Sequence, residues 1–382
     1  MKTFTKKFLI FISPIVILSG LNFLFLKDLG ELKNFTELSI RNQQDGALIG
    51  LSYSEEVKQF KFKNIQSREP EILTLGTSRV LQVRDLYFKT PHSFYNAGRL
   101  VTKLNDITSF LENYPGNFPK IIILGLDQNF FSYQWDSLAD KGFVNFTPKN
   151  DLPQRTLTCS RKFIPDILKN KVDWSLYGNT DSSKIGLTAL THNEGFRADG
   201  SYLYGRHILS KDDKYGYSFN DTKKRIKKQR SRFKHSHINP KALIEFENIL
   251  TFCAESNIHL ITFLPPYSNE IYNELNQQAE QYPYIFKLQE TLSPLCKKYG
   301  SSIYDFSDLA DLGANDFETI DGFHGSETAY LKMIKILSTN EPKLAEKINI
   351  QKINHLIHNP YSARQLIYEL KEAQPQTIHK GH

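Results

Sequence analysis

The stretch EILTLGTSRV, residues 71–80, joins an apolar run to a short polar segment. The run from Ile72 to Leu75 stops at a glycine and is followed at once by a threonine, the hydroxyl of Ser78 and the charge of Arg79. Short apolar runs that end in a small residue are typical of buried strands in parallel sheets. Functional groups in such sheets gather beyond the carboxyl ends of the strands. We therefore expect Ser78 to lie at the functional edge of a sheet.

Similar apolar runs recur along the chain, and helical patterns follow them. This alternation predicts an α/β protein built on a parallel sheet of about five strands. The five expected strands are Ile72 to Leu75, Ser93 to Tyr95, Ile121 to Leu124, Leu260 to Leu264 and Ile303 to Phe306.

Three helices have clear sequence signals. Apolar residues recur at helical spacing in TKLNDITSFLENY, residues 102–114. Asn239 followed by Pro240 is typical of a helix N-cap with proline in the first turn. The last helix of the core is expected to begin near Ser326 and to run through Leu337.

The N-terminus carries an uncharged apolar stretch from Phe8 to Leu26, long enough to cross a bilayer as a helix. A cleaved signal peptide and an uncleaved anchor both fit this pattern. We favour the anchor, because the stretch is longer than a usual signal core and no small-x-small cleavage site follows it. The lysines before it, Lys2, Lys6 and Lys7, place the N-terminus in the cytoplasm and the rest of the chain outside. In a bacterium that side is the periplasm or the cell surface, so we expect a single-pass protein of the inner (cytoplasmic) membrane.

The remaining chain divides into four parts. We expect a cytoplasmic tip and transmembrane signal-anchor over residues 1–27, a stalk and the start of the outer domain over 28–70, an α/β domain over 71–340 and a helical tail over 341–382. Residues 131–238 are too long for one crossover and are interpreted as an insertion over one end of the sheet. It contains the basic run 222–237, which suits an anionic envelope surface or a solvated face, with nucleic acid the least favoured partner.

Chemistry is expected from three residues that lie far apart in the sequence. A serine needs a base within hydrogen-bond reach, and that base must be oriented by a third group. Asp321 and His324 lie three residues apart in TIDGFHGSE and supply both parts. The alternative for Ser78 is a helix cap, since serines that follow strands often have that role.

These motifs resemble the sequence blocks of the SGNH (GDSL-like) hydrolase superfamily. The resemblance covers roughly residues 70–340 and rests on Gly76-Thr77-Ser78, on Asn96 to Gly98, on GLDQN at 125–129 and on Asp321-x-x-His324. It implies a three-layer α/β/α sandwich, with Ser78 as nucleophile, His324 as general base and acid, and Asp321 as its orienting partner. Arg79 follows the serine as a candidate substrate contact.

The chain departs from the superfamily pattern at two positions. Where a glycine is usual after the second block, this chain has Val101, and where an asparagine is usual in the third block, it has Asp127. The backbone N–H groups of Ser78 and of Gly98 or Val101, together with the side chain of Asn129, are the expected oxyanion donors.

Anchored proteins that open with a G-[TS]-S-[RE] block resemble one subgroup, the DltD-type teichoic acid D-alanylation and alginate O-acetylation proteins. The resemblance implies acyl transfer, chiefly O-acetyl, on an envelope polysaccharide or lipid-linked glycan, beside a membrane-bound O-acyltransferase of the MBOAT type. GFRADGSYLYG, residues 195–205, resembles a substrate-side loop of such proteins, with Arg197 and Asp199 as contacts. The alternatives are a stand-alone lipase-like or carbohydrate esterase and a catalytically degenerate assembly subunit. No cofactor is expected, and no metal motif or phosphate-binding loop is evident.

Overall fold

The computed structural model describes residues 2–53, 57–135, 151–178, 181–205 and 219–367. Five strands form an all-parallel sheet, as predicted, in the spatial order β3-β2-β4-β8-β9. Counted along the chain this is the doubly wound order 2-1-3-4-5, whose switch point lies between β2 and β4. The register aligns Leu73 with Tyr95 on one side and with Ile122 on the other. The strands are β2 (Ile72–Gly76), β3 (Phe94–Gly98), β4 (Ile121–Gly125), β8 (His259–Leu264) and β9 (Ser302–Asp305).

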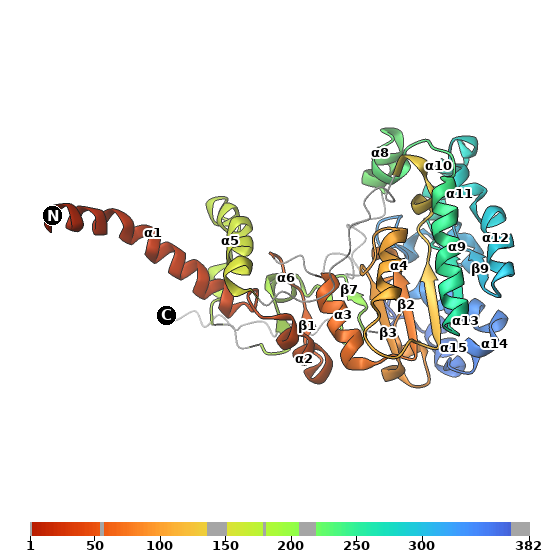
Figure 1. Cartoon of the computed structure of the whole chain (residues 1–382), viewed down its shortest axis with the longest axis horizontal. Coiled ribbons are helices and arrows are strands. Elements are labelled where there is room, and N and C mark those ends of the chain that lie inside the picture. Colours follow the sequence, from red (N-terminus) through yellow and green to blue (C-terminus); the bar gives the residue numbers. More distant parts are fainter. Residues whose placement is uncertain (1, 54–56, 136–150, 179–180, 206–218, 368–382) are drawn as a thin grey trace, which may run out of the picture.

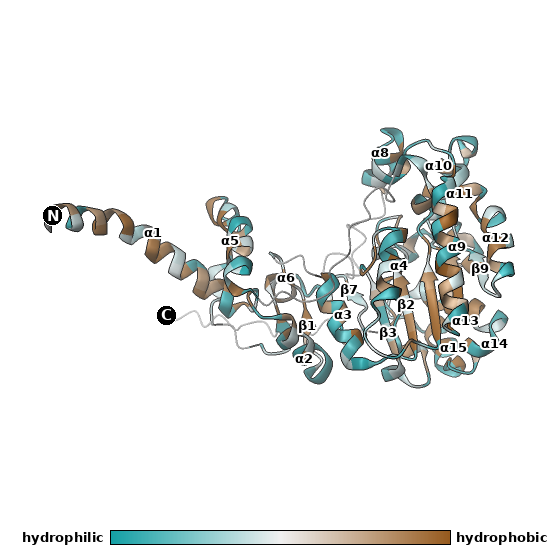
Figure 2. Cartoon of the chain, in the orientation of Figure 1, coloured by the Kyte–Doolittle hydropathy of each residue, from teal (hydrophilic) through white to brown (hydrophobic). Residues whose placement is uncertain are grey.

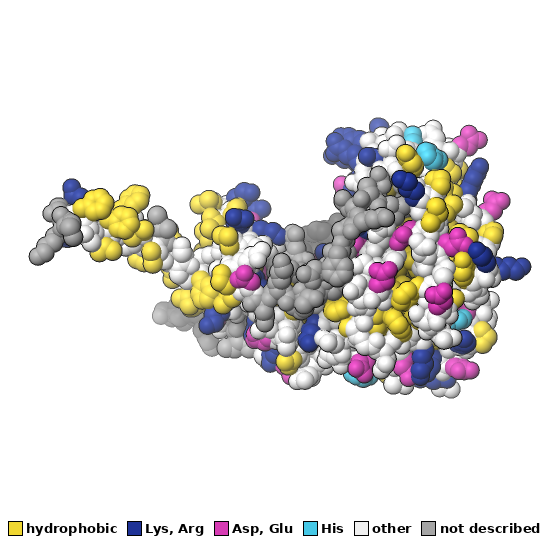
Figure 3. Space-filling view, viewed as in Figure 1, with side chains coloured by type: hydrophobic (Ala, Val, Ile, Leu, Met, Phe, Trp, Pro, Cys, Tyr) yellow, Lys and Arg dark blue, Asp and Glu magenta, His cyan; other side chains and the backbone are white. Residues whose placement is uncertain are grey.

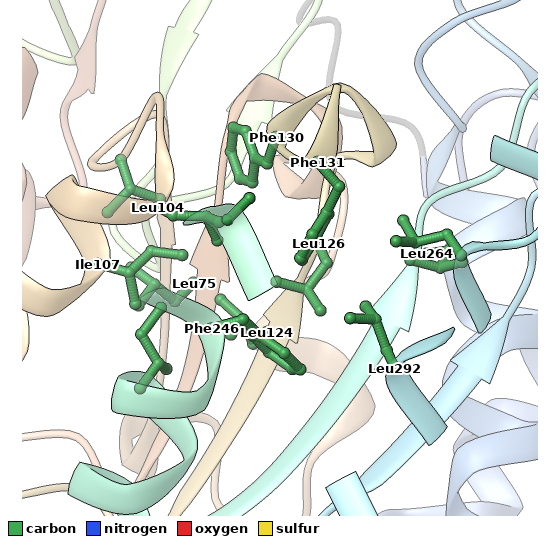
Figure 4. Close-up of a cluster of buried hydrophobic side chains, with 14 of the residues drawn as sticks. Leu75, Leu104, Ile107, Leu124, Leu126, Phe130, Phe131, Phe246, Leu264 and Leu292 are labelled. Carbon is green, nitrogen blue, oxygen red and sulfur yellow. The ribbon is translucent and has the colours of Figure 1, made fainter. Parts of the chain in front are cut away.

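Buried side chains cover both faces of this sheet, because successive residues of a strand point to opposite sides. Leu75 and Leu124 contribute to a core that includes residues of α4, α9 and α12 (Figure 4). Ile72 and Ile123 contribute to a second core with α13 and α15. The central strands β2 and β4 therefore consist largely of apolar residues, in keeping with a sheet buried on both faces.

Helices occur throughout the chain (Figure 1). The predicted helices are confirmed: Asn239 caps α9 by accepting from the Lys241 N–H at 3.0 Å, and Ser326 caps α13. The helices are α1 (Lys2–Asp28), α2 (Phe35–Asp45), α3 (Val57–Arg68), α4 (Leu104–Glu112), α5 (Leu152–Leu168), α6 (Leu187–His192), α8 (Asn220–Lys227), α9 (Pro240–Glu255), α10 (Asn269–Asn276), α11 (Pro283–Phe286), α12 (Leu288–Lys298), α13 (Glu327–Asn340), α14 (Pro342–Ala345) and α15 (Ile350–His358).

The predicted second strand is displaced. Residues 96–98 were expected in the loop after it, but they belong to β3. The reason is Asn96, whose side-chain amide is fully buried and donates to the carbonyls of Val80 and Val83 at 2.8 and 2.9 Å. A polar side chain that finds buried acceptors does not end a strand.

A second, small sheet was not predicted. It has the order β5-β1-β6-β7 and joins β1 (Leu48–Ile49), before the α/β domain, to three strands from the predicted insertion. These are β5 (Lys184–Ile185), β6 (Gly195–Phe196) and β7 (Tyr202–Leu203). The segment expected as a stalk thus contains α2, β1 and α3, and it packs against residues from more than a hundred positions later. No local pattern marks two-residue strands whose partners are so distant.

The N-terminal helix α1 extends away from the rest of the chain (Figure 1), and hydrophobic residues predominate along it (Figure 2). It is long and apolar enough to cross a membrane, by length and composition. At the other end of the chain, α14 and α15 pack on the second core through Leu344, Ile353 and Leu356. The three cysteines, Cys159, Cys253 and Cys296, are buried and unpaired with one another.

Candidate active site

Two strand ends, those of β2 and β9, bring the candidate residues together. Ser78 begins a short 3₁₀ turn, Ser78–Val80, directly after β2 at the switch point of the sheet. Asp321 and His324 lie on the loop that leads from β9 into α13. The order of the strands explains this proximity, because all of them end at the same edge.

The three side chains form a hydrogen-bonded series. Ser78 Oγ lies 2.9 Å from His324 Nε2, and His324 Nδ1 lies 2.9 Å from Asp321 Oδ2. Both separations suit hydrogen bonds, and the series has the order hydroxyl, imidazole, carboxylate. With the imidazole Nδ1 protonated toward the carboxylate, Nε2 is left to accept the serine proton.

The Asp321 carboxylate is held by its own loop. Its Oδ1 accepts from the backbone N–H groups of Phe323 and His324 at 3.0 and 2.9 Å. Loss of hydration acts to raise the Asp321 pKa, but the charge of His324 and these hydrogen bonds hold the pKa well below its usual range. The lowered pKa favours the ionised carboxylate, which accepts from His324 Nδ1 and so orients the imidazole.

Thr77, rather than Ser78, caps the turn after β2. The Thr77 hydroxyl accepts from the Arg79 N–H at 3.2 Å and donates to Asp127 Oδ2 at 2.9 Å. The helix-cap interpretation of Ser78 is therefore wrong, since its hydroxyl faces His324 instead. The polar segment after β2 thus contains two hydroxyls with different contacts. The Thr77 hydroxyl caps the turn, whereas the Ser78 hydroxyl faces His324.

Arg79 was expected as a substrate contact, and its burial contradicts this. The side chain is 1% exposed, and the rings of Tyr267 and Phe323 lie 4.4 and 4.3 Å from its guanidinium carbon. Its guanidinium donates to four oxygens at 2.6 to 3.1 Å: the side chain of Gln128 and the carbonyls of Pro265, Pro266 and Phe323. Arg79 therefore joins the loop of Ser78 to the loop of His324 and is a positioning residue.

Asp127 replaces the usual asparagine, and its charge is offset locally. Its Oδ2 accepts from Thr77 and lies 3.2 Å from an Arg232 nitrogen, while its Oδ1 lies 4.0 Å from Arg79. Arg232 also lies 5.0 Å from the ring of Phe323, the neighbour of His324. The contact of Arg232 with Asp127 was not predicted. Arg232 is one of many cations in the basic run, and it lies 105 positions from Asp127.

The insertion also covers the loop of the base. Thr222 of α8 donates to the Asp321 carbonyl at 3.2 Å. Phe219, just before α8, packs on Gly322, where a Cβ would come within 2.8 Å of the phenyl ring. Gly322 also has a positive φ of 79°, so both conformation and space require glycine between Asp321 and His324.

The expected oxyanion donors differ in their surroundings. The Gly98 N–H already donates to Asn96 Oδ1 at 2.8 Å, so Gly98 is not an available donor. Val101 has a fully buried side chain in the first core. Asn129 is 2% exposed, and among the described residues its Nδ2 has no hydrogen-bond partner. An orphaned buried amide is costly unless something is bound there, which makes Asn129 the strongest candidate.

Arg197 and Asp199 were expected to contact substrate, and their contacts within the protein contradict this. Asp199 is 3% exposed and accepts from Ser201 N–H and Oγ at 2.9 and 2.6 Å and from Arg84 Nε at 3.2 Å. Arg197 donates to Glu327 at 2.8 Å, and Glu327 also accepts from Arg84 at 2.8 Å. The loop that contains Arg197 and Asp199 is thus attached to Arg84 and to Glu327 of α13. The charged side chains of the loop form these attachments.

The carboxyl group of Asp85 predicts a pH dependence of the stability of the protein. Burial first, and then the nearby charge of Asp199, raise the pKa of Asp85 to about 7. Because this folded-state value exceeds that of an unfolded chain, the stability it contributes is complete below about pH 4 and is lost as pH rises through 7. We expect the melting temperature of Asp85→Asn to depend less on pH between 5 and 8 than that of the wild type. Parallel profiles of the two proteins would show that Asp85 is ionised throughout.

No family model matches the chain, no curated protein has a significant match, and no solved structure has one. The proposed function therefore depends on the geometry of Ser78, His324 and Asp321. Among the described residues, no cluster of three or more His, Cys, Asp or Glu side chains is placed to hold a metal ion.

A cavity of about 200 Å³ lies beside the β3 end of the sheet, between α2, α3 and the small sheet. Its lining includes Phe60, Phe196, Tyr202 and Arg99. Arg99 has a positive φ of 67°, and its N–H donates to the Gly76 carbonyl at 3.0 Å, two residues before Ser78. Backbone hydrogen bonds thus join the cavity lining to the segment around Ser78, from Arg99 N–H to the Gly76 carbonyl and from Tyr202 N–H to the Leu81 carbonyl.

Proposed function

We propose that the protein is a membrane-anchored serine esterase or O-acyltransferase of the SGNH type. The observation that carries the proposal is the hydrogen-bonded series from Ser78 through His324 to Asp321 at the carboxyl edge of a parallel sheet. In such a series each group has a distinct role, and removal of any one disables the unit. Helices packed on both faces of the sheet support the finer assignment of a three-layer α/β/α sandwich.

The proposed reaction proceeds in two steps. Ser78 Oγ attacks an acyl carbonyl, while His324 Nε2 takes the hydroxyl proton and returns it to the leaving alcohol as the ester bond breaks. In the second step His324 takes a proton from an acceptor hydroxyl or from water, whose oxygen attacks the acyl-serine. The proton then returns to Ser78 as the acyl group leaves. Asp321 stabilises the imidazolium in both steps.

We propose that the oxyanion is held by the Ser78 backbone N–H and the Asn129 side chain. The first N–H groups of a helical turn have no acceptor within the turn, and Ser78 begins one. Asn129 Nδ2 is buried with no partner among the described residues. The carboxylate of Asp127 is paired with Thr77 and Arg232 and so does not oppose the developing charge.

The oxyanion assignment predicts the kinetics of one variant. We expect Asn129→Ala to lower kcat by about 10²- to 10³-fold with little change in KM, because the lost hydrogen bond forms only in the transition state. Asn340→Ala, at the exposed end of α13, is the matched control. Steady-state hydrolysis of p-nitrophenyl acetate measures both. An Asn129→Ala enzyme with the wild-type kcat would remove Asn129 from the reaction.

The acceptor is proposed from the resemblance and from the apolar N-terminal helix. An O-acyl group, chiefly acetyl, on an envelope polysaccharide or lipid-linked glycan fits a domain held outside the membrane, next to a membrane-bound O-acyltransferase. The three lysines before the apolar stretch favour a cytoplasmic N-terminus and an outer domain. Acyl release from p-nitrophenyl acetate, measured with and without an added unacetylated polysaccharide, separates transfer from hydrolysis, because only transfer leaves the acyl group on the added acceptor.

A further inference from the structure

Helix α5 presents apolar side chains on two opposite faces. Its inner face buries Cys159 and Phe163 fully. On the other side Leu157, Ile164 and Leu168 are 52%, 48% and 82% exposed. Their spacings of seven and four residues place them in one stripe. A soluble domain seldom exposes such a stripe unless another surface covers it.

The inner face is fixed to the end of α1. Asn22 donates to Ser160 Oγ at 2.6 Å, and the rings of Phe25 and Phe163 stack at 5.4 Å. Arg155 of α5 also donates to the carbonyls of Leu32 and Lys33, just past α1, at 3.3 and 2.9 Å. Figure 1 shows α5 lying crosswise to α1 at this point. These contacts hold α5 against the C-terminal end of α1.

That position coincides with a change in the surroundings of α1. Large apolar side chains of α1 are exposed as far as Leu24, whereas Phe25 and Leu26 are buried in the protein. The stretch from Phe8 to Leu24, in which most of the described apolar side chains are exposed, is about 25 Å long at ~1.5 Å per residue, close to the ~30 Å hydrocarbon thickness of a bilayer. A bilayer crossed by α1 would therefore end at the level of α5.

The residues around α5 suit a membrane interface. Trp174 and Tyr177 are 50% and 59% exposed and pack on Phe25 with centroid distances of 4.8 and 6.3 Å. Half-exposed tryptophan and tyrosine are characteristic of the level of the lipid headgroups. Cations lie close by at Lys27 and Arg161, both exposed. Figure 3 shows hydrophobic side chains along α1 and over α5, with basic ones beside them.

We propose that α5, with Trp174 and Tyr177, lies in the outer interface of the bilayer that α1 crosses. Leu157, Ile164 and Leu168 enter the boundary between headgroups and acyl chains, while Cys159 and Phe163 face the protein. The inference rests on the proposed membrane insertion of α1. It adds a second attachment, which stops the outer domain from rotating about α1 and fixes which side of it faces the lipid.

Tryptophan quenching in nanodiscs tests this arrangement in the full chain. The two native tryptophans are first replaced in Trp135→Phe/Trp174→Phe, and single reporters are then introduced as Leu157→Trp or Leu168→Trp. Phospholipids brominated in the upper acyl chain quench indoles that lie ~5–10 Å below the headgroup boundary. We expect both reporters to lose at least about half of their emission, relative to unbrominated lipid, if α5 lies at that depth.

Two matched reporters separate the possible outcomes. Leu21→Trp lies on the exposed part of α1 and reports its insertion, whereas Thr158→Trp is exposed on α5 away from the stripe. Quenching at Leu21, Leu157 and Leu168, but much less at Thr158, supports the proposal. Quenching at Leu21 alone overturns it and shows that the stripe faces water or a protein partner. Absence of quenching at Leu21 as well overturns the membrane insertion of α1, on which the inference rests.

Discussion

Full-length protein carrying Ser78→Ala is expected to lose all labelling by a fluorophosphonate probe. The probe forms a covalent bond with a serine only where a base removes the hydroxyl proton, and His324 Nε2 lies 2.9 Å from Ser78 Oγ. We expect His324→Ala to lower esterase turnover by about 10³-fold or more and Asp321→Asn by a comparable factor, because the carboxylate sets the imidazole tautomer. Turnover of p-nitrophenyl acetate and labelling seen on a gel measure these effects.

The controls distinguish a catalytic loss from a folding defect. Ser293→Ala alters a partly exposed serine of α12 and should label like the wild type. Thermal melting of each variant should show that Ser78→Ala remains folded, since the serine side chain contributes little buried area. Labelling that persists in Ser78→Ala would reject Ser78 as the nucleophile. A folded wild type that neither labels nor turns over ester, alone or with a membrane partner, would support the degenerate assembly subunit instead.

Substitution of Arg79 is expected to cause the largest loss of stability. Arg79→Ala removes a donor from four buried oxygens, those of Gln128, Pro265, Pro266 and Phe323, and it removes a cation near Asp127. Removal of one partner from a buried charged network costs about 3–5 kcal/mol in the free energy of unfolding. Arg79→Lys should recover only part of this, because an ammonium group cannot reach four acceptors in a planar arrangement.

Chemical denaturation of the full chain in detergent measures this loss. Arg225→Ala is the matched control, since Arg225 is 53% exposed and forms an exposed ion pair with Asp221 of the same helix. Its cost should be within about 1 kcal/mol. Activity provides a second test, because the Phe323 carbonyl held by Arg79 adjoins His324. If Arg79→Ala has the same free energy of unfolding as Arg225→Ala, the hydrogen bonds of Arg79 between the Ser78 loop and the His324 loop contribute nothing to stability.

Sequence alone determined the elements that follow from local pattern. Alternating apolar runs and helical spacing predicted five parallel strands, and Asn239 and Ser326 marked helix starts by local capping chemistry. The pairing of Asp321 with His324 could also be predicted from the sequence. Two residues three positions apart on one loop can hydrogen-bond whatever the tertiary structure around them. The length and apolar composition of the N-terminal helix belong to the same class of local evidence.

Only the tertiary structure decided which polar residues face the site. Ser78 and Arg79 are neighbours in sequence, yet the serine hydroxyl reaches His324 while the guanidinium is buried among carbonyls. Arg197 and Asp199 had the appearance of binding residues but are used in fastening their loop, whereas Arg232 reaches Asp127 from a distant basic run. A hydrogen-bonding side chain has the same sequence pattern whether its partner is protein or substrate. Its role is determined by the chain segments packed around it, and these lie up to about 250 positions away.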